Sequence, residues 1–158
     1  MGAALPENDG VRTAVDVVVR RLMAEDASAV AELSDQLGYP GSAEELRKRI
    51  ETMARSEDRI AFAAVRTTQL VGWIDAAVER HLQAPDTVVI GGLVVRESAR
   101  GCGVGKRLCE EVEDWARSRG FRRVRVRSQI KREDAHRFYL RDGYEQVKTS
   151  LVFEKKLE

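Results

Sequence analysis

The sequence predicts a mixed α/β fold in which about four helices flank one sheet. Short runs rich in Val and Ile, which are typical of strands, alternate along the chain with apolar stripes of helical period. The patterns come in the order strand, two helices, three strands, helix, strand, helix and two strands. Helices and strands that alternate in this way pack as layers around a shared core, so one α/β sandwich is expected.

The first strand and the first two helices come from local patterns. Residues 15–20 (VDVVVR) are rich in β-branched side chains and predict a strand. Asp26 begins a helix, whose apolar stripe stops at Gly38. The segment 42–45 (SAEE) is a capping box, which predicts the start of a second helix.

Three strands follow in the middle of the chain. They are expected at residues 60–66 (IAFAAVR), 70–78 (LVGWIDAAV) and 87–95 (TVVIGGLVV). The third is apolar almost throughout, which predicts a strand covered on both faces. The pair Gly91-Gly92 inside it predicts a bulge or a close approach of another backbone or side chain.

The last part of the chain predicts two helices and three strands. Residues 122–128 (RRVRVRS) alternate as a strand does, with valines on one face and arginines on the other. A helix is expected at 134–142, and paired strands are expected at 144–147 and 151–157. A helix that ends at Gly120 is expected before residue 122. Four apolar residues, spaced four, four and three positions apart, form one side of it: Val104, Leu108, Val112 and Trp115.

Length and composition indicate one globular domain. The chain has 158 residues, of which 43% are hydrophobic and 34% are charged. We expect a flexible N-terminus over residues 1–12 and a single domain over residues 13–158. No run approaches the roughly 20 apolar residues that cross a bilayer, and the first residues do not form a secretory signal. No membrane partner is therefore expected.

The cysteines indicate where the protein works. Cys102 and Cys109 lie seven residues apart, which matches neither a zinc site nor a disulfide framework. Neither histidine has a metal-ligating partner at helical spacing. A reducing, cytoplasmic location and no bound metal are expected.

Positive charge is concentrated in the second half of the chain. The net charge is +1, yet residues 96–141 hold 14 Lys and Arg against 7 Asp and Glu. This part is suited to anions. Three arginines of the expected fifth strand share one face, where they either pair with carboxylates in solvent or dock an acidic acceptor or nucleic acid: Arg123, Arg125 and Arg127. No aromatic residues are interleaved with them, which argues against stacking on single-stranded nucleic acid.

A glycine-rich turn at residues 100–105 (RGCGVG) leads directly into the third helix. The free N–H groups of a helix start and the helix dipole favour an anion, and glycines let a ligand approach the backbone closely. A Walker A motif fails at two positions here, and a dinucleotide-binding fingerprint lacks its last glycine. The alternative to a phosphate site is a turn that only links strand to helix.

Another phosphate-binding pattern does fit this turn. The order R-x-x-G-x-G at residues 100–105, after an apolar strand and before an amphipathic helix, resembles the pyrophosphate-binding motif of the GNAT superfamily of N-acetyltransferases. Residues 135–139 (AHRFY), with 142–144 (DGY), are similar to the family's A-x-x-x-Y-x-x-x-G-[FY] segment. The likeness covers about residues 15–157 and keeps the order of the elements.

The resemblance implies an acyl-CoA N-acyltransferase fold, with a mostly antiparallel mixed sheet that splays apart between its fourth and fifth strands. It implies acetyl-CoA as donor co-substrate and a primary amine, on a small molecule or a peptide, as acceptor. By this likeness the fourth strand holds pantetheine and the turn holds pyrophosphate. The residues assigned to acetyl-CoA are Leu93, Val94, Val95, Arg100, Gly101, Cys102, Gly103, Val104, Gly105 and Lys106. Many members carry Asn where this chain has Arg132, which either contacts the ADP end of CoA or is a solvated loop residue.

The resemblance also implies the catalytic groups. Tyr139 matches the family's general acid, because a phenol with a pKa of about 10 can protonate a leaving thiolate. The alternative is an aromatic core residue of the fourth helix. The amine needs a base, for which the candidates are Asp75, Glu79, His81 and Glu97; Glu79 is assigned because its strand should border the acceptor. Direct transfer in a ternary complex is expected, since no Cys or Ser stands out as a nucleophile.

Two other functions stay open. A non-catalytic domain that binds or senses acyl-CoA would share this fold. A basic nucleic-acid-binding module would use the strand arginines, although the near-zero total charge argues against it. Members of the family commonly form dimers, so a homodimer is implied. The sequence does not distinguish a small amine, an aminoglycoside, a polyamine, a protein N-terminus or a lysine as acceptor.

Overall fold

The computed structural model describes residues 16–36 and 38–158. The chain forms two compact units, one ending at Arg127 and the other running from Ser128 to Glu158. The flexible terminus predicted over residues 1–12 lies outside the described residues, as does the start of the first predicted strand.

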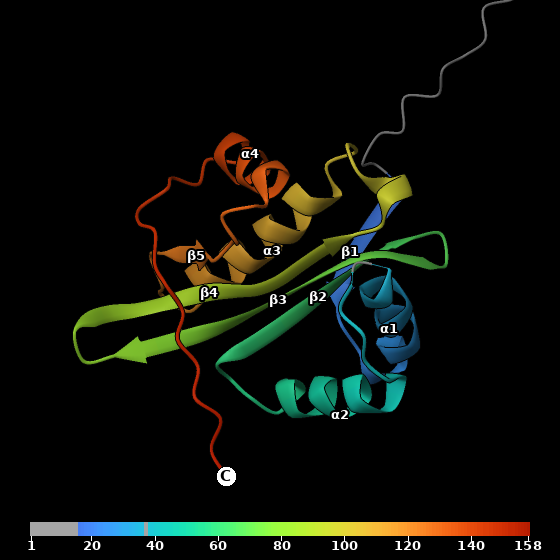
Figure 1. Ribbon diagram of the computed structural model, residues 1–158. Coiled ribbons are helices and arrows are strands. Elements are labelled where there is room, and N and C mark those ends of the chain that lie inside the picture. Colours follow the sequence, from blue (N-terminus) through green and yellow to red (C-terminus); the bar gives the residue numbers. More distant parts are fainter. Residues whose placement is uncertain (1–15, 37) are drawn as a thin grey trace, which may run out of the picture. The chain divides into compact units, whose positions relative to one another are not determined.

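Five strands form one sheet in the first unit, in the order β1-β2-β3-β4-β5 (Figure 1). Neighbouring strands pair antiparallel except β4 and β5, which are parallel. The predicted mixed, mostly antiparallel sheet is therefore confirmed. The strands are β1 (Val17–Arg21), β2 (Arg59–Arg66), β3 (Gln69–His81), β4 (Ala84–Val95) and β5 (Val124–Val126).

The β3–β4 hairpin is longer than predicted. Glu79 pairs with Thr87, and His81 pairs with Ala84, so β3 runs past its expected end at residue 78 and β4 begins before its expected start at residue 87. The side chains here are polar, so they interrupt the apolar pattern from which strands are predicted. The backbone ladder does not depend on that polarity, and it continues to the turn.

The pairing between β4 and β5 is short. It joins only Val88 to Val124, Val89 to Arg125 and Ile90 to Val126. The second half of β4 continues along β3 as far as the pair Gly72 and Val95. β5 therefore leaves β4 halfway along its length, which confirms the predicted splay.

Helices cover both faces of this sheet (Figure 1). On one face α1 (Ala27–Asp35) packs beside α2 (Ala43–Ala54), whose N-cap Ser42 accepts a hydrogen bond from the Glu45 N–H at 3.1 Å, as predicted. The core below α1 contains Val30, Leu33, Ala63, Leu70 and Val94. On the other face lies α3 (Val104–Ser118), which buries residues spaced to form one stripe: Val104, Leu108, Cys109, Val112 and Ala116.

Gly72 lets α3 approach the sheet closely. A Cβ atom at this position would lie 2.9 Å from the Val94 carbonyl oxygen and 3.2 Å from Leu108 Cδ1. The first of these neighbours is backbone, which cannot move without disturbing the β3–β4 pairing. A glycine inside the predicted strand thus sets the position of the helix that follows the glycine-rich turn.

We expect Gly72→Val to lower the free energy of unfolding by about 1–3 kcal/mol, because overpacking displaces α3 or the strand. Urea unfolding followed by circular dichroism measures this. Gly41→Ala is the matched control, since its Cβ would meet only Leu46 Cγ at 4.0 Å and should leave the midpoint almost unchanged. Equal midpoints for the two variants would contradict the close packing at Gly72.

The second unit contains α4 (Glu133–Arg141), which is followed, after its C-cap Asp142, by Gly143 with a φ of 90°. The strands predicted at 144–147 and 151–157 are wrong: residues 142–158 form no helix or strand. Their apolar side chains are exposed, with Val152 at 90% and Phe153 at 88%. An alternating pattern becomes a strand only where a partner edge accepts its hydrogen bonds, and the described residues of this tail have none.

Candidate functional site

The second half of β4 has a backbone edge that faces away from β3. The Arg96 N–H donates to the Val71 carbonyl on β3 at 2.8 Å. N–H groups alternate between the two edges of a strand, so those of Leu93 and Val95 point to the other edge, which β5 has already left. At that edge Arg100 Nε donates to the Val95 carbonyl at 3.0 Å. An extended ligand could pair here as an added strand does.

The glycine-rich turn follows this edge directly. Gly101 and Gly103 have φ values of 75° and 80°, in the left-handed region that favours glycine. A Cβ at Gly101 would meet nothing within 4 Å, so the glycine is needed for its backbone conformation and not for space. Gly103 is the N-cap of α3, and the first turn of α3 has no side-chain cap and no acidic residue. The N–H groups at the start of this helix are therefore available to an anion.

Other residues assigned to acetyl-CoA support the turn. Val94 and Val104 are buried, at 6% and 1% exposure, so their side chains fix the strand and the helix, and the Val104 backbone lies at the helix start that could face a ligand. Gly105 lies in the first turn of α3, and Lys106 Nζ lies 4.0 Å from Glu110. The half-buried Cys102 thiol donates to the Arg100 carbonyl at 3.7 Å.

A bulge on β4 lies beside Asp75 on β3. Asp75 pairs with Gly92, but the next residue of β3 pairs with Ile90, so Gly91 is left over. A Cβ on Gly91 would lie 2.8 Å from Asp75 Oδ2. The sequence predicted a bulge or a close approach at the Gly91-Gly92 pair. The structure has both, and the group that lies close to the glycine backbone is the Asp75 carboxyl.

The environment of Asp75 differs from that of an ordinary surface carboxylate. Burial raises the pKa of Asp75, while the charge of Arg59 and a hydrogen bond from the Gly92 N–H partly oppose the shift. The ring of Trp73 lies on the same side of the strands, with two carbons 2.9 Å from the Cβ position of Gly92. A half-buried carboxyl against an aromatic ring and bare backbone holds a proton more readily than a surface Asp does, which suits it to proton transfer.

Glu79 has a different environment. Both of its carboxylate oxygens accept hydrogen bonds from Arg127, each at 2.7 Å. These bonds lower the pKa of Glu79 to about 2, and His81 at 3.4 Å adds to the effect. Of the three arginines predicted on one face, Arg127, just after β5, therefore pairs with a carboxylate, as one of the two interpretations expected. A carboxylate with so low a pKa is a weak base.

Glu97, the remaining base candidate, lies in the short helix η3 (Glu97–Ala99) between β4 and the turn. Its carbonyl accepts the Arg100 N–H at 3.2 Å. The residue is exposed.

Tyr139 and Arg132 belong to the second unit. Tyr139 is half-buried in α4, with its ring edge-on to Phe138 at 5.1 Å and to Tyr144 at 5.6 Å between centroids. Arg132 is the exposed N-cap of α4, and its carbonyl accepts the His136 N–H at 3.1 Å. The assignments of Tyr139 as acid and of Arg132 as a CoA contact stay predictions.

A family model for the acetyltransferase (GNAT) family matches residues 27–144, which is most of the chain and includes the turn and the Tyr139 segment. The chain belongs to the GNAT acetyltransferase family.

Several GNAT relatives are similar to this chain. It is 39% identical over 84 residues to aminoalkylphosphonate N-acetyltransferase of Salmonella typhimurium, a match that covers 52% of this chain and 54% of the relative. It is 25% identical over 145 residues to aminoglycoside N(6')-acetyltransferase type 1 of Stenotrophomonas maltophilia, covering 89% of this chain and 94% of the relative. The chain thus spans about half the length of the aminoalkylphosphonate N-acetyltransferase.

The fold has close counterparts among solved structures. One is aminoglycoside N-acetyltransferase AAC(6')-Iy in complex with CoA, with a TM-score of 0.80 and 18% identity over 89% of this chain and 95% of the other. At that identity the likeness concerns the fold, which is the GNAT fold predicted from the sequence.

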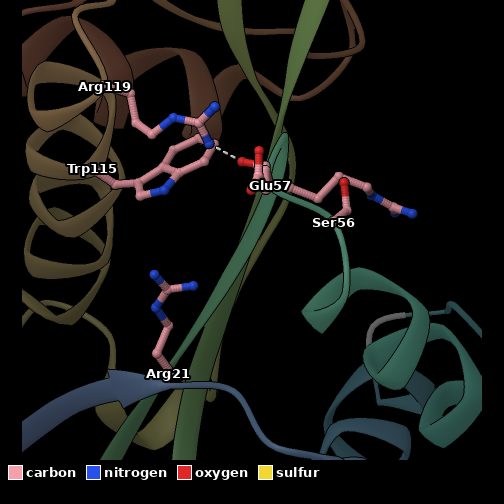
Figure 2. A pocket seen from close by; sticks show the side chains of 6 residues that line it. Arg21, Ser56, Glu57, Trp115 and Arg119 are labelled. Atoms are coloured by element: carbon pink, nitrogen blue, oxygen red, sulfur yellow. Dashed lines mark hydrogen bonds between the residues drawn. The ribbon is translucent and has the colours of Figure 1, made fainter.

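A hollow of about 470 Å³ lies elsewhere on this GNAT unit (Figure 2). Arg119 donates to the Glu57 carbonyl there and lies over the Trp115 ring, 5.4 Å from its centroid. This is the C-terminal end of α3, about 22 Å along the helix from the glycine-rich turn, so the hollow is separate from that turn. Its lining residues are Arg21, Ser56, Glu57, Arg59, Trp115 and Arg119.

Within residues 16–36 and 38–158, no three His, Cys, Asp or Glu side chains gather as metal ligands do. None of the helices in this part of the chain has the length and apolar character needed to cross a membrane.

Proposed function

We propose that this protein transfers an acetyl group from acetyl-CoA to a primary amine. The observation that carries the proposal is the continuity of the open β4 edge with the glycine-rich turn. The N–H groups of Leu93 and Val95 offer an edge to an extended arm, and the start of α3 offers free N–H groups to phosphates only a few residues later. Arg100 joins the two through its bond to Val95.

These residues fit the chemistry of CoA. Pantetheine carries amides that can pair with a strand edge, and its pyrophosphate carries the charge that a helix N-terminus favours. Arg100 and Lys106 add positive charge at the turn. Arg132 is proposed to contact the phosphates of the ADP part, and the charge of the second half of the chain favours this.

The proposed reaction is a direct transfer in a ternary complex. The amine nitrogen bonds to the thioester carbonyl carbon, and the bond from that carbon to sulfur breaks. The proton lost by the amine goes to a base, and the released thiolate takes a proton from the Tyr139 hydroxyl. A phenol is suited to this role because it stays protonated at neutral pH until a thiolate forms beside it.

Asp75 is a better base for this reaction than Glu79, which the sequence favoured. Its raised pKa brings its basicity closer to neutral pH, whereas Glu79 is held as a low-pKa carboxylate by Arg127. Asp75 also lies one strand from the open edge, against the bulge where that edge begins. Glu79 is proposed to orient Arg127 instead.

We expect Asp75→Asn to lower kcat about 100-fold and Glu79→Gln to change kcat less than threefold. A base acts when deprotonated, so activity is lost as pH falls through its pKa. Because burial raises the pKa of Asp75, the acid limb of the kcat/KM profile should lie above the ordinary range of Asp. The Asp75→Asn profile should lack that limb. A limb that persists in Asp75→Asn and disappears in Glu79→Gln would restore Glu79 as the base.

The proposal as a whole is tested by titrating the wild-type protein with acetyl-CoA in a calorimeter and then following thiol release with a panel of amines. We expect micromolar binding and amine-dependent release of CoA. Binding without release for any amine would favour a non-catalytic acyl-CoA-binding domain. No binding by the folded protein would overturn the proposal. Gel filtration in the same buffers tests the proposed homodimer.

A further inference from the structure

The sheet face around Asp75 carries positive charge that is not neutralised, and Arg59 is the cation beside Asp75 on the neighbouring strand β2. Arg59 on β2 pairs with Ala77, and Ala61 pairs with Asp75, so Arg59 and Asp75 are diagonal neighbours on one face. Diagonal neighbours are within reach of a long side chain, and the charge of Arg59 does act on Asp75. Among the described residues, the Arg59 side chain has no hydrogen bond or ion pair. The residues directly between the two charges are alanines.

The carboxylates on the strands near Arg59 are already paired, except Asp75. Glu79 is bound by Arg127 through both oxygens. Asp58 and Asp86 both bind Arg80, and Asp58 also lies 3.4 Å from Arg119. A ligand with several positive charges needs several free carboxylates. This face offers one, with an unpaired guanidinium beside it.

Asp75 itself is arranged to receive an ammonium group. Its Oδ1 atom lies 3.1 Å from the Cβ position of Gly92, and ring carbons of Trp73 lie 2.9 Å from the same point. A carboxylate next to an aromatic ring is a common arrangement for binding an amine cation. Because positions 91 and 92 are glycines, no side chain stands between this pair and the open edge of β4.

We propose that the acceptor is a small zwitterion, whose amine lies at Asp75 and whose anionic group, a phosphonate, phosphate or carboxylate, is bound by Arg59. This inference rests on the proposed function and narrows its acceptor. A lone amine at Asp75 is repelled by Arg59, whereas an amine that carries its own anion gains a second ion pair. Polyamines and aminoglycosides, which carry only positive charges, do not meet this condition.

The test uses small amines of matched length with acetyl-CoA as donor. 2-Aminoethylphosphonate and β-alanine carry an anion, propylamine carries no second charge, and ethylenediamine carries a second cation. We expect kcat/KM for the better anionic amine to exceed that for ethylenediamine at least 30-fold. The phosphonate and the carboxylate are compared directly, so the preferred anion is identified in the same assay.

Arg59 variants separate recognition from catalysis. Arg59→Gln should raise KM for the anionic amines at least 10-fold, with their kcat within threefold, and should not raise KM for propylamine, which Arg59 repels. Arg59→Glu should invert the order, so that ethylenediamine becomes better than either anionic amine. Arg55→Gln is the matched control, since it removes another exposed arginine at the end of α2.

Three outcomes would overturn the inference in distinguishable ways. Equal or better use of ethylenediamine by the wild type, or Arg59 variants that affect all amines equally, would overturn the zwitterionic acceptor and leave the acetyltransferase intact. Binding of acetyl-CoA without transfer to any amine would remove the proposed function and this inference together. Calorimetric titration of the CoA complex with each amine gives a second readout, in which Arg59→Gln should weaken only the anionic amines.

Discussion

Replacing Gly103 by Glu will weaken the binding of acetyl-CoA at least 100-fold. Gly103 has a φ of 80° and is the N-cap of α3, so its substitution strains the backbone that presents the free N–H groups. The new carboxylate would also compete for these groups and repel the pyrophosphate. Each charge-assisted hydrogen bond contributes about 1.5–3 kcal/mol, so the loss of two such bonds already exceeds a factor of 100. Calorimetric titration measures the change.

Gly120→Glu is the matched control for this variant. Gly120 has a φ of 82°, and it follows the other end of the same helix. The two substitutions add the same side chain at nearly the same backbone conformation, so they impose similar strain. Only Gly103→Glu alters the start of the helix, and Gly120→Glu should bind acetyl-CoA as the wild type does. If both variants fold and bind acetyl-CoA normally, the turn is a connection and not a phosphate site.

Much of the fold could be predicted from the sequence because the signals are local. The apolar stripe of α3 and the alternation of β5 depend only on which residues recur at which spacing. The Ser42 cap and the positive φ at Gly103 likewise follow from residue type and position. The glycine-rich turn could be recognised for the same reason, since its residues are adjacent in the chain.

The parts that could not be predicted depend on partners far away in the chain. Glu79 and Arg127 lie 48 residues apart, and only the β3–β4–β5 register brings them together. That pairing turns the base favoured by the sequence into a carboxylate with a pKa of about 2. The pKa of Asp75 shifts in the opposite direction, because burial beside the bulge on β4 raises it. A single sequence indicates which groups can ionise but not what surrounds them.

The predicted final strands failed for a related reason. Residues 144–147 and 151–157 have the composition of strands, but strand formation requires a neighbouring edge as well as a pattern. These apolar side chains are not buried in this structure: Val147, Leu151 and Phe153 are 69%, 79% and 88% exposed. Local propensity therefore identified the residues suited to strands without identifying a partner for them.

Replacing Tyr139 by Phe will lower kcat by about 10²–10⁴-fold while leaving acetyl-CoA affinity within a factor of two. The substitution removes only the hydroxyl, and the ring keeps its edge-on contacts with Phe138 and Tyr144. Without the acid, the thiolate of CoA must leave unprotonated, which raises the barrier of the chemical step but not of binding. Steady-state rates and calorimetric titration of the same preparation measure the two effects separately.

Tyr144→Phe is the control for Tyr139→Phe, since it removes a hydroxyl from the other tyrosine of the same ring cluster. Its kcat should stay within threefold of the wild type. A second test uses an acetyl thioester of an aromatic thiol, whose thiolate leaves readily without a proton. With that donor the difference between Tyr139→Phe and the wild type should shrink at least 10-fold, because a better leaving group has less need of an acid. If the Tyr139→Phe variant keeps the wild-type kcat with acetyl-CoA, the hydroxyl does not act as the acid, and Tyr139 serves α4 as a packing residue.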